Sequence, residues 1–410
     1  MSVASWTAGL FARVRGREEK GVYERWLEML EQGSKTKAGP AVTLRTAFRV
    51  SASLACLREI SQGGAQVPFK LFQEFEQNGL QRKRAAREHP LYDLITAKPN
   101  GWQTAFEFRE TLLLHAALGN AYAFKNYYRG QIAELILLNP SQVKAKQLED
   151  WAIEYTVTGK NGESRKVDPR LIWHVRGPSW DGAVGLDILD LAREALGLSV
   201  ALEESQSSLH ANGIRPSGTY SVDGTLNKEQ RDALASWLKR QAGANAAGAP
   251  LILDRGAKWL QQSMTSVDAQ AKEMRDQQIE EVARFFGVLP IVIGHTGDKS
   301  STYASAEAMF AAQREKCLAR WWQRVQESAD VNLLTDEERR QGYYFKHVPN
   351  GLLLASAKDQ GDYFAKALGS GGAPAWLTQD EVRGYLELDP MGGTAAALPV
   401  ATNLPPANGA

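Results

Sequence analysis

The sequence predicts an α+β fold in which two long helices enclose a small strand–helix–strand unit. Apolar residues recur along one side of two segments, at about 186–212 and 267–286, and this spacing is typical of long amphipathic helices. The residues between these segments contain strand patterns around one short helical pattern. Before about Asp181, helix and hairpin signals are mixed, which favours an α+β unit in that part of the chain.

Length and charge limit the range of functions. The chain has 410 residues, enough for two or three cores, and 43% of its residues are hydrophobic against 23% charged. Lys and Arg total 48 and Asp and Glu total 47, so the formal net charge is +1. Tight, non-specific phosphate binding needs a clear basic excess. Any nucleic-acid contact is therefore expected to be local, transient or weak.

The cysteines and the N-terminus favour a soluble protein of a reducing cytoplasm. Cys56 and Cys317 are the two cysteines and form neither a disulfide framework nor a zinc motif. The first 20 residues are too polar for a signal peptide, and no stretch approaches the roughly 18 apolar residues of a membrane span.

The first part of the chain predicts these elements in order. Residues 1–41 read as a loosely structured arm with one short helix at 22–30, and apolar spacing predicts a helix over 42–60. A strand follows at 67–75, and the basic run 81–87 is interpreted as a solvated turn. Thr104 and Glu107 form a capping box that opens a helix to about Leu118.

Two strand pairs are expected next. Residues 121–128 and 132–139 flank the turn 129–131 and predict a hairpin. Strands are also expected at 151–158 and 171–175, with the turn 159–163 between them.

The middle and the end of the chain are more helical. Between the two long helices we expect a strand at 217–222, a helix at 228–240, an Ala/Gly-rich loop at 243–250, and strands at 251–254 and 258–264. A polar loop at 294–303 leads into a third long helix that ends near Leu334. Helices at 355–368 and 378–386 follow, and the Gly-, Ala- and Pro-rich tail after Pro390 is expected to be disordered.

No motif points to catalysis, to a metal or to a cofactor. The sequence lacks GxSxG, HExxH and GxGxxG, and the loop 294–300 lacks the spacing of a phosphate-binding loop. His115 and His174 fall in a helix and a strand, where we expect satisfied core histidines. Trp321 and Trp322 favour core or subunit contact over base stacking. We therefore expect a protein that is not an enzyme.

Several distinctive segments follow one another along the chain. The N-terminal ones are HPLYDLI, KPN, TAFEFRETLLLHAALGNAYA and LILLNPSQV. The later ones are LIWHVRG, DGAVGLDILDLAREALGL, HANGIRPSGTY and EEVARFFGVLPIVIG. In this order, the segments resemble the portal protein family of long-tailed, siphophage-type bacteriophages. The resemblance covers roughly residues 45–390, and its specificity comes from the order and spacing of motifs that are weak one by one.

The resemblance implies a head–tail connector ring, usually of twelve subunits, at one vertex of the virion capsid. It divides the chain into an arm at 1–41, a wing at 42–186 and 288–350, stem helices at 187–213 and 265–287, a clip at 214–264, a crown at 351–390 and a tail at 391–410. The implied role is a channel for DNA packaging and genome ejection, assembled in the host cytoplasm. The implied partners are sequence-independent double-stranded DNA, the large terminase, the major capsid and scaffold proteins and the head-completion adaptor, with no membrane.

Three groups of residues are candidate sites under this resemblance. The first group consists of acidic stem residues, which would repel DNA from the channel wall: Glu203, Glu204, Asp276 and Glu280. The alternative is that these residues form ring contacts or face solvent. Basic clip residues would dock the motor and the adaptor: Arg231, Lys239, Arg240 and Lys258. The polar loop would contact the DNA backbone, or would only end a wing helix: His295, Lys299, Ser300, Ser301, Thr302 and Tyr303.

Two other interpretations remain. One is another phage head or adaptor protein, but such adaptors are too short to contain two long helices around an α/β insert. The other is an enzyme with a cleft between the α+β part and the helical part, which the missing catalytic set disfavours.

Overall fold

The computed structural model describes most of the chain before residue 211 and most of its C-terminal part. The described residues are 34–77, 80–159, 161–211, 219–221, 227–229, 231–233, 236, 258–260, 267–296, 303–349, 357–370, 374–386 and 388–399. The chain divides into two units, 1–346 and 347–410, and each is described by itself. The helix expected at 22–30 and the strand expected at 251–254 lie outside the described residues.

A three-stranded antiparallel sheet lies at the centre of the first unit. Its order is β10 (Ile172–Arg176), β5 (Asn120–Tyr128) and β6 (Gln131–Leu138). The turn between β5 and β6 holds Arg129 at φ 51° and Gly130 at φ 83°, the left-handed geometry that suits a two-residue hairpin. The predicted hairpin is therefore confirmed.

Helices cover one face of this sheet. The helix α7 (Ala105–Ala117) begins at the predicted capping box, where the Thr104 hydroxyl accepts the Glu107 amide and the Glu107 carboxylate accepts the Thr104 amide. Together with α6 (Pro90–Thr96) and α13 (Ala319–Leu333), it buries an apolar cluster around Trp173 and Leu135. Trp322 lies buried and donates from Nε1 to the Gly64 carbonyl at 3.1 Å, which confirms a core role for this residue.

The next sheet corrects the predicted pairing of the strand at 151–158. The turn after β8 (Ile153–Thr158) leads to β9 (Ser164–Val167), so that β7 (Val143–Gln147), β8 and β9 form their own sheet. The predicted partner, the strand at 171–175, pairs instead with β5 as β10. The strand β9 has the sequence SRKV and shows no apolar alternation, which is why the sequence does not reveal it.

The basic run 81–87 is a strand for most of its length, and not a turn. Residues Leu80–Ala85 form β4, which pairs with β3 (Phe69–Gln77), while β13 (Tyr343–His347) lies on the other side of β3. The Arg84 guanidinium lies 5.1 Å from the centre of the Phe75 ring. Side-chain stems that cover apolar groups in this way allow a charged sequence to form an edge strand.

The segment 42–60, which was expected to form one helix, forms two helices, and a π-helical segment follows the second. The helix α3 (Leu44–Arg49) ends at Val50, which is extended at φ −69° and ψ 109°, and α4 (Ser51–Arg58) begins anew after it. The π-helical segment η2 (Glu59–Gly63) and α5 (Gly64–Gln66) continue from α4. The short strands β1 (Ser34–Lys35) and β2 (Ala41–Val42) precede α3.

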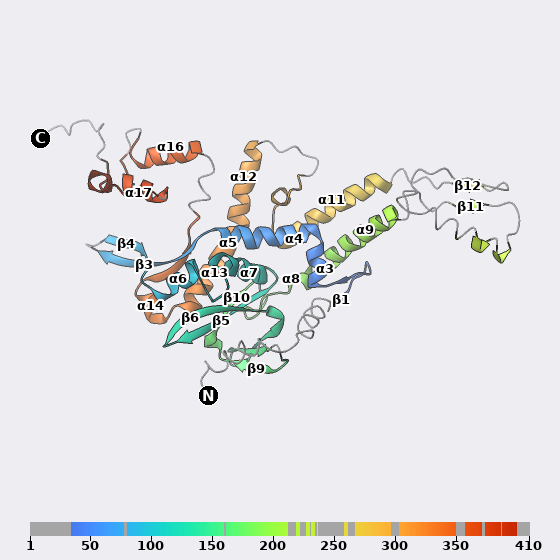
Figure 1. Cartoon of the computed structure of the whole chain (residues 1–410), viewed down its shortest axis with the longest axis horizontal. Helices are drawn as coiled ribbons and strands as arrows, with labels where there is room; N and C mark the ends of the chain where they lie inside the picture. The colour runs from blue at the N-terminus through green and yellow to red at the C-terminus, as the bar shows by residue number, and fades with distance from the viewer. Residues whose placement is uncertain are drawn as a thin grey trace. The chain divides into compact units, whose positions relative to one another are not determined.

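The two long helices are present and lie side by side (Figure 1). After α8 (Ile188–Leu191), α9 (Arg193–Ala211) leads away from the central sheet and α11 (Val267–Phe286) returns to it. Between them, β11 (Thr219–Ser221) pairs antiparallel with β12 (Lys258–Leu260). The helix expected at 228–240 is helical at its described residues 228–229, 231–233 and 236.

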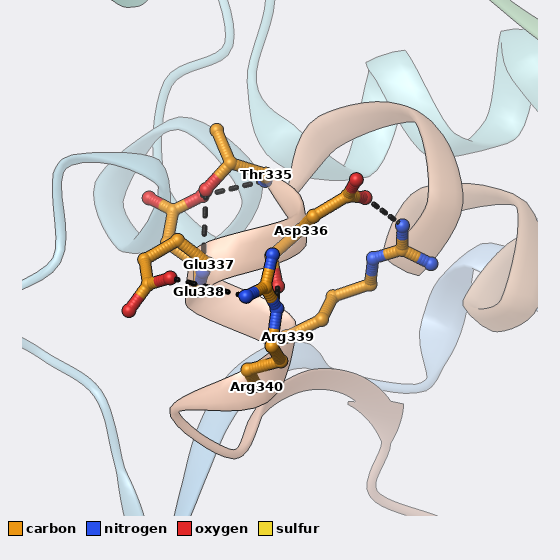
Figure 2. A network of polar contacts seen from close by, with 6 residues as sticks. All are labelled: Thr335, Asp336, Glu337, Glu338, Arg339 and Arg340. Atoms are coloured by element: carbon orange, nitrogen blue, oxygen red, sulfur yellow. Dashed lines mark hydrogen bonds and ion pairs between the residues drawn. The ribbon is translucent and has the colours of Figure 1, made fainter.

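The third long helix is interrupted. The short 3-10 helix η6 (Pro290–Ile293) precedes α12 (Tyr303–Gln313), and the π-helical segment η7 (Arg314–Leu318) separates α12 from α13. After α13, a capping box between Thr335 and Glu338 opens α14 (Asp336–Arg340), as Figure 2 shows. Arg339 pairs with Asp336, and Arg340 lies 3.8 Å from Glu337.

The second unit contains the two helices predicted near the C-terminus. They are α16 (Ala357–Ala367) and α17 (Gln379–Tyr385), the latter capped by Thr378 and Glu381. Disorder was expected from residue 391 onward, and this boundary is too early. The carboxylate of Asp380 accepts the amides of Met391 and Gly392, and the 3-10 helix η8 (Gly393–Ala396) buries Ala395.

Candidate functional site

The helix pair α9/α11 is held together by an apolar seam and by polar contacts. Leu196 of α9 and Val282 of α11 are buried in the same apolar cluster. Arg275 of α11 donates from Nη1 to Oε1 of Gln206 on α9 at 2.8 Å. Fully buried side chains of this size each contribute about 1.5–3 kcal/mol, so this burial stabilises the base of the helix pair.

The acidic candidates on the helix pair α9/α11 differ in exposure and pairing. Glu203 and Glu204 of α9 are exposed. Glu280 of α11 lies 3.2 Å from Arg284, one turn further along the same helix, which offsets part of its charge. Glu203 and Glu204 are therefore the stronger candidates for a repulsive surface.

The structure brings together two candidates that the sequence placed in different groups. His295 Nδ1 lies 4.0 Å from Asp276 Oδ1 on α11, and the His295 side chain is 14% exposed. Its Nε2 is buried and has no hydrogen-bond partner among the described residues. The His295 amide donates to the Pro290 carbonyl at 3.0 Å, so both backbone and side chain hold this residue at the base of the loop.

The other loop and clip candidates are only partly described. Tyr303 is the first residue of α12, Arg231 is exposed, and Lys258 lies in β12. Four loop candidates and two clip candidates lie outside the described residues: Lys299, Ser300, Ser301, Thr302, Lys239 and Arg240. The roles predicted for these groups stay predictions.

The two core histidines behave differently. His174 Nδ1 lies 3.1 Å from the Tyr155 hydroxyl and its Nε2 lies 2.9 Å from Asn120 Oδ1, and burial lowers its pKa to about 3. This confirms a satisfied core histidine. Burial also lowers the pKa of His115 to about 4, but its Nδ1 has no partner among the described residues. The expectation of a satisfied core histidine is therefore not confirmed for His115.

His115 borders a cavity of about 910 Å³ that sequence reasoning did not find. Its wall combines residues from the helix α7, the sheet β7–β8–β9 and the start of the helix pair, including Lys144, Glu154, Asp187 and Arg193. The wall carries both cations and carboxylates, so its charge selects no single class of ligand. No sequence motif spans these residues, because they come from distant segments.

Neither cysteine is an activated thiol, and the described residues form no cluster of metal ligands. Burial raises the pKa of Cys56 to about 12 and that of Cys317 to about 11, so both thiols stay protonated at neutral pH. No group of three or more His, Cys, Asp or Glu residues in the described part of the chain is arranged to hold a metal ion. Within the same part, no helix is both long and apolar enough to span a membrane.

Comparison with known proteins gives one consistent family. A family model described as "Phage portal protein" matches residues 51–387. The portal protein of Enterobacteria phage HK97 is 28% identical over 370 residues, which cover 87% of this chain and 83% of that protein.

Two solved structures share the fold. A chain in the neck of an empty GTA (gene transfer agent) particle, computed with C6 symmetry, has a TM-score of 0.59 and 24% identity over 90% of this chain and all of that one. A chain in the neck of a native GTA particle, computed with C12 symmetry, has a TM-score of 0.54 and 24% identity over 85% of this chain and 93% of that one.

Proposed function

Because the chain belongs to the phage portal protein family, we propose that its copies close into a ring whose channel carries double-stranded DNA into and out of a capsid. The observation that carries this proposal is the family match over residues 51–387. The sixfold and twelvefold symmetry of the related necks supports a ring, and we propose twelve subunits.

Within this ring, the helix pair α9/α11 is the proposed stem. The proposed clip at 214–264 lies between the two helices in sequence, and the proposed wing contains the sheets β10–β5–β6 and β13–β3–β4. The residues from 351 to 390 are the proposed crown. One end of α9/α11 then joins the proposed wing on the capsid side, and the other end carries the proposed clip on the side that meets other proteins.

The stem is proposed to repel DNA rather than bind it. Glu203 and Glu204 are exposed on α9, and a ring repeats their charge once per subunit. Repulsion between these carboxylates and phosphates acts over about one Debye length, roughly 8–10 Å at moderate salt. The duplex would thus stay near the axis and could slide without being held, which fits the net charge of +1.

The loop between η6 and α12 is the proposed point of DNA contact. Lys299 supplies a cation, and the hydroxyls of residues 300–303 supply short contacts to phosphate oxygens that carry no sequence information. His295 is a weaker candidate for DNA contact, because its side chain lies against Asp276. We propose that His295 anchors the loop and that residues 299–303 meet the DNA.

The proposed function also includes the docking of other proteins. We propose that the basic clip residues dock the large terminase during packaging and the head-completion adaptor afterwards. Contacts with the major capsid and scaffold proteins would hold the ring at its vertex. The proposed role is that of a conduit with no reaction of its own.

The decisive experiment images the purified full-length protein and measures its DNA binding. We expect closed rings with a central hole in negative-stain images, and weak, salt-dependent binding of a DNA duplex. The double variant Glu203→Lys/Glu204→Lys should keep the ring and bind DNA at least about tenfold more tightly at low salt. A stable monomer would contradict the ring, and unchanged DNA binding by the double variant would contradict the acidic channel wall.

A further inference from the structure

The helix α12 has the composition of a buried helix. Its eleven residues, YASAEAMFAAQ, include one charged side chain, Glu307, and its alanines and large apolar residues are distributed around the whole helix. A helix that is apolar all round is normally covered on all sides, whereas a surface helix has a polar face.

In the single subunit, three consecutive described residues of α12 are exposed. Ala308, Met309 and Phe310 are all exposed, with exposed fractions of 42% for Met309 and 53% for Phe310. Successive residues of an α-helix point about 100° apart, so three consecutive exposed residues span about 200° of the circumference. More than half of the helix circumference is therefore exposed at residues 308–310.

The C-terminal end of α12 packs against its own subunit. There the helix contacts η6 and continues into η7, and the Leu289 amide donates to Oε1 of the buried Gln313 at 3.0 Å. Figure 1 shows α12 leading away from the elements that surround its last turn. The helix is thus fixed at its C-terminal end, while Ala308, Met309 and Phe310 stay exposed in the single subunit.

We propose that α12 packs between the α12 helices of the two neighbouring subunits, so that these helices stand side by side around the channel. This inference rests on the ring proposed above. A single partner covers a stripe of about 100° on a helix, which is too little for the surface around residues 308–310. A cyclic ring supplies two neighbours through one repeated head-to-tail interface, and both flanks of the same helix become buried.

The dimensions agree with a channel. Helices pack at about 8–10 Å between axes, so twelve of them side by side have a circumference of about 100–120 Å and a radius of about 15–19 Å. Subtracting about 5 Å for the half-width of a helix leaves an opening of about 20–28 Å. This opening is similar to the width of a DNA duplex.

A membrane is a poor alternative occupant. Eleven residues are about half of what a membrane-spanning helix needs. A helix that lies on a membrane surface has a strongly charged face, which α12 lacks. A different capsid protein remains the competing occupant, and the cross-linking experiment below separates it from a second copy of this chain.

The first test places charge on the exposed surface of α12 in the full-length protein. We expect Met309→Glu/Phe310→Glu to lower the fraction of closed rings at least tenfold in native mass spectra and negative-stain images. The matched control is Val331→Glu on α13, where an apolar side chain is 63% exposed on a different helix. The control should keep its rings, and both variants should keep the circular dichroism of the wild type. Rings in the double variant at the wild-type level would overturn the proposal.

The second test asks which chains meet at α12. Residues 308 and 310 point about 200° apart, so they lie on opposite flanks and cannot be bridged within one helix. With a short bis-maleimide, the double variant Ala308→Cys/Phe310→Cys should give a ladder of cross-linked multimers, while each single variant should give almost none. The natural thiols of Cys56 and Cys317 are buried and should not react.

The outcomes separate this inference from the proposed function. A wild type without rings contradicts the proposed function itself. A wild type with rings but no ladder from the double cysteine variant contradicts only the placement of α12 and leaves another protein as the occupant of its surface.

Discussion

His295 Nδ1 lies 4.0 Å from Asp276 Oδ1, and this contact connects the segment after Pro290 to the helix α11. The chain reverses between the two residues at Gly287, which has φ 67°, and at η6. A displacement of α11 would therefore be transmitted to the base of the loop that is proposed to meet DNA.

Removal of the His295–Asp276 contact should release the base of the loop without unfolding the subunit. We expect Asp276→Asn to increase amide exchange in residues 294–303 several-fold, while the free energy of unfolding changes by less than about 1 kcal/mol because the pair is partly exposed. Hydrogen exchange with mass spectrometry measures the amide exchange of residues 294–303 and of the rest of the subunit. The control Glu280→Gln, one turn away, should leave the loop unchanged; equal effects of the two variants would contradict a specific anchor.

Asp330 predicts a pH dependence of stability. Burial raises the pKa of this carboxyl to about 6, although it accepts the Phe345 amide at 2.7 Å. The folded state therefore holds its proton more tightly than the unfolded state, where the pKa is near 4. This group contributes stability below about pH 4, and that contribution is lost as the pH rises through 6.

Asp330→Asn should abolish this loss, because the amide oxygen still accepts from Phe345 and cannot ionise. We expect the variant to be more stable than the wild type by about 1 kcal/mol at pH 7, after allowance for solvent screening, and equally stable near pH 4. Urea unfolding at several pH values gives the comparison. His115 and His174 titrate in the same range, but they do so in both proteins and cancel in the difference. A constant difference between pH 4 and 7 would be the contrary result.

Gly185 fixes the entry to the helix pair. Its amide donates to Asn120 Oδ1 at 2.8 Å, and a Cβ at this position would lie 1.9 Å from the Gly119 carbonyl oxygen. We expect Gly185→Ala to destabilise the protein by at least about 3 kcal/mol, since the colliding atom belongs to the backbone. The control Gly101→Ala meets nothing within 4 Å and should change stability by less than about 0.5 kcal/mol. Thermal unfolding compares the two, and a mild effect of Gly185→Ala would show that the backbone can shift.

Local signals predicted the elements of this fold well. The capping box at Thr104, the hairpin at 121–138 and the two long helices each depend on residues close together in sequence. The strands β4 and β9 were missed because charged residues fill them, and their formation depends on a neighbouring strand. A strand that is stabilised mainly by its partner leaves little trace in its own sequence.

The segments that make up the candidate site could be predicted from the sequence, but the contacts between them could not. Sequence reasoning identified both His295 and Asp276, yet gave one to DNA contact and the other to the channel wall. Their contact depends on the reversal between α11 and η6, which no local pattern specifies. The cavity beside His115 was missed for the same reason, because its walls come from segments that are distant in sequence.

The basic residues of the proposed clip have a matched set elsewhere in the chain, which allows their docking role to be tested. We expect Arg231→Glu/Lys239→Glu/Arg240→Glu to weaken binding of the large terminase at least tenfold and to leave the ring intact, since charge reversal replaces attraction by repulsion at a docking surface. The control reverses three exposed basic residues on or beside β4: Arg82, Lys83 and Arg87. Both triple variants change the net charge equally, so the difference between them reports position rather than total charge.

Binding can be followed by light scattering of the ring with the terminase, and ring closure by negative-stain images. Equal weakening by both triple variants would assign the effect to net charge, and undiminished terminase binding by the clip variant would move the docking surface away from the clip.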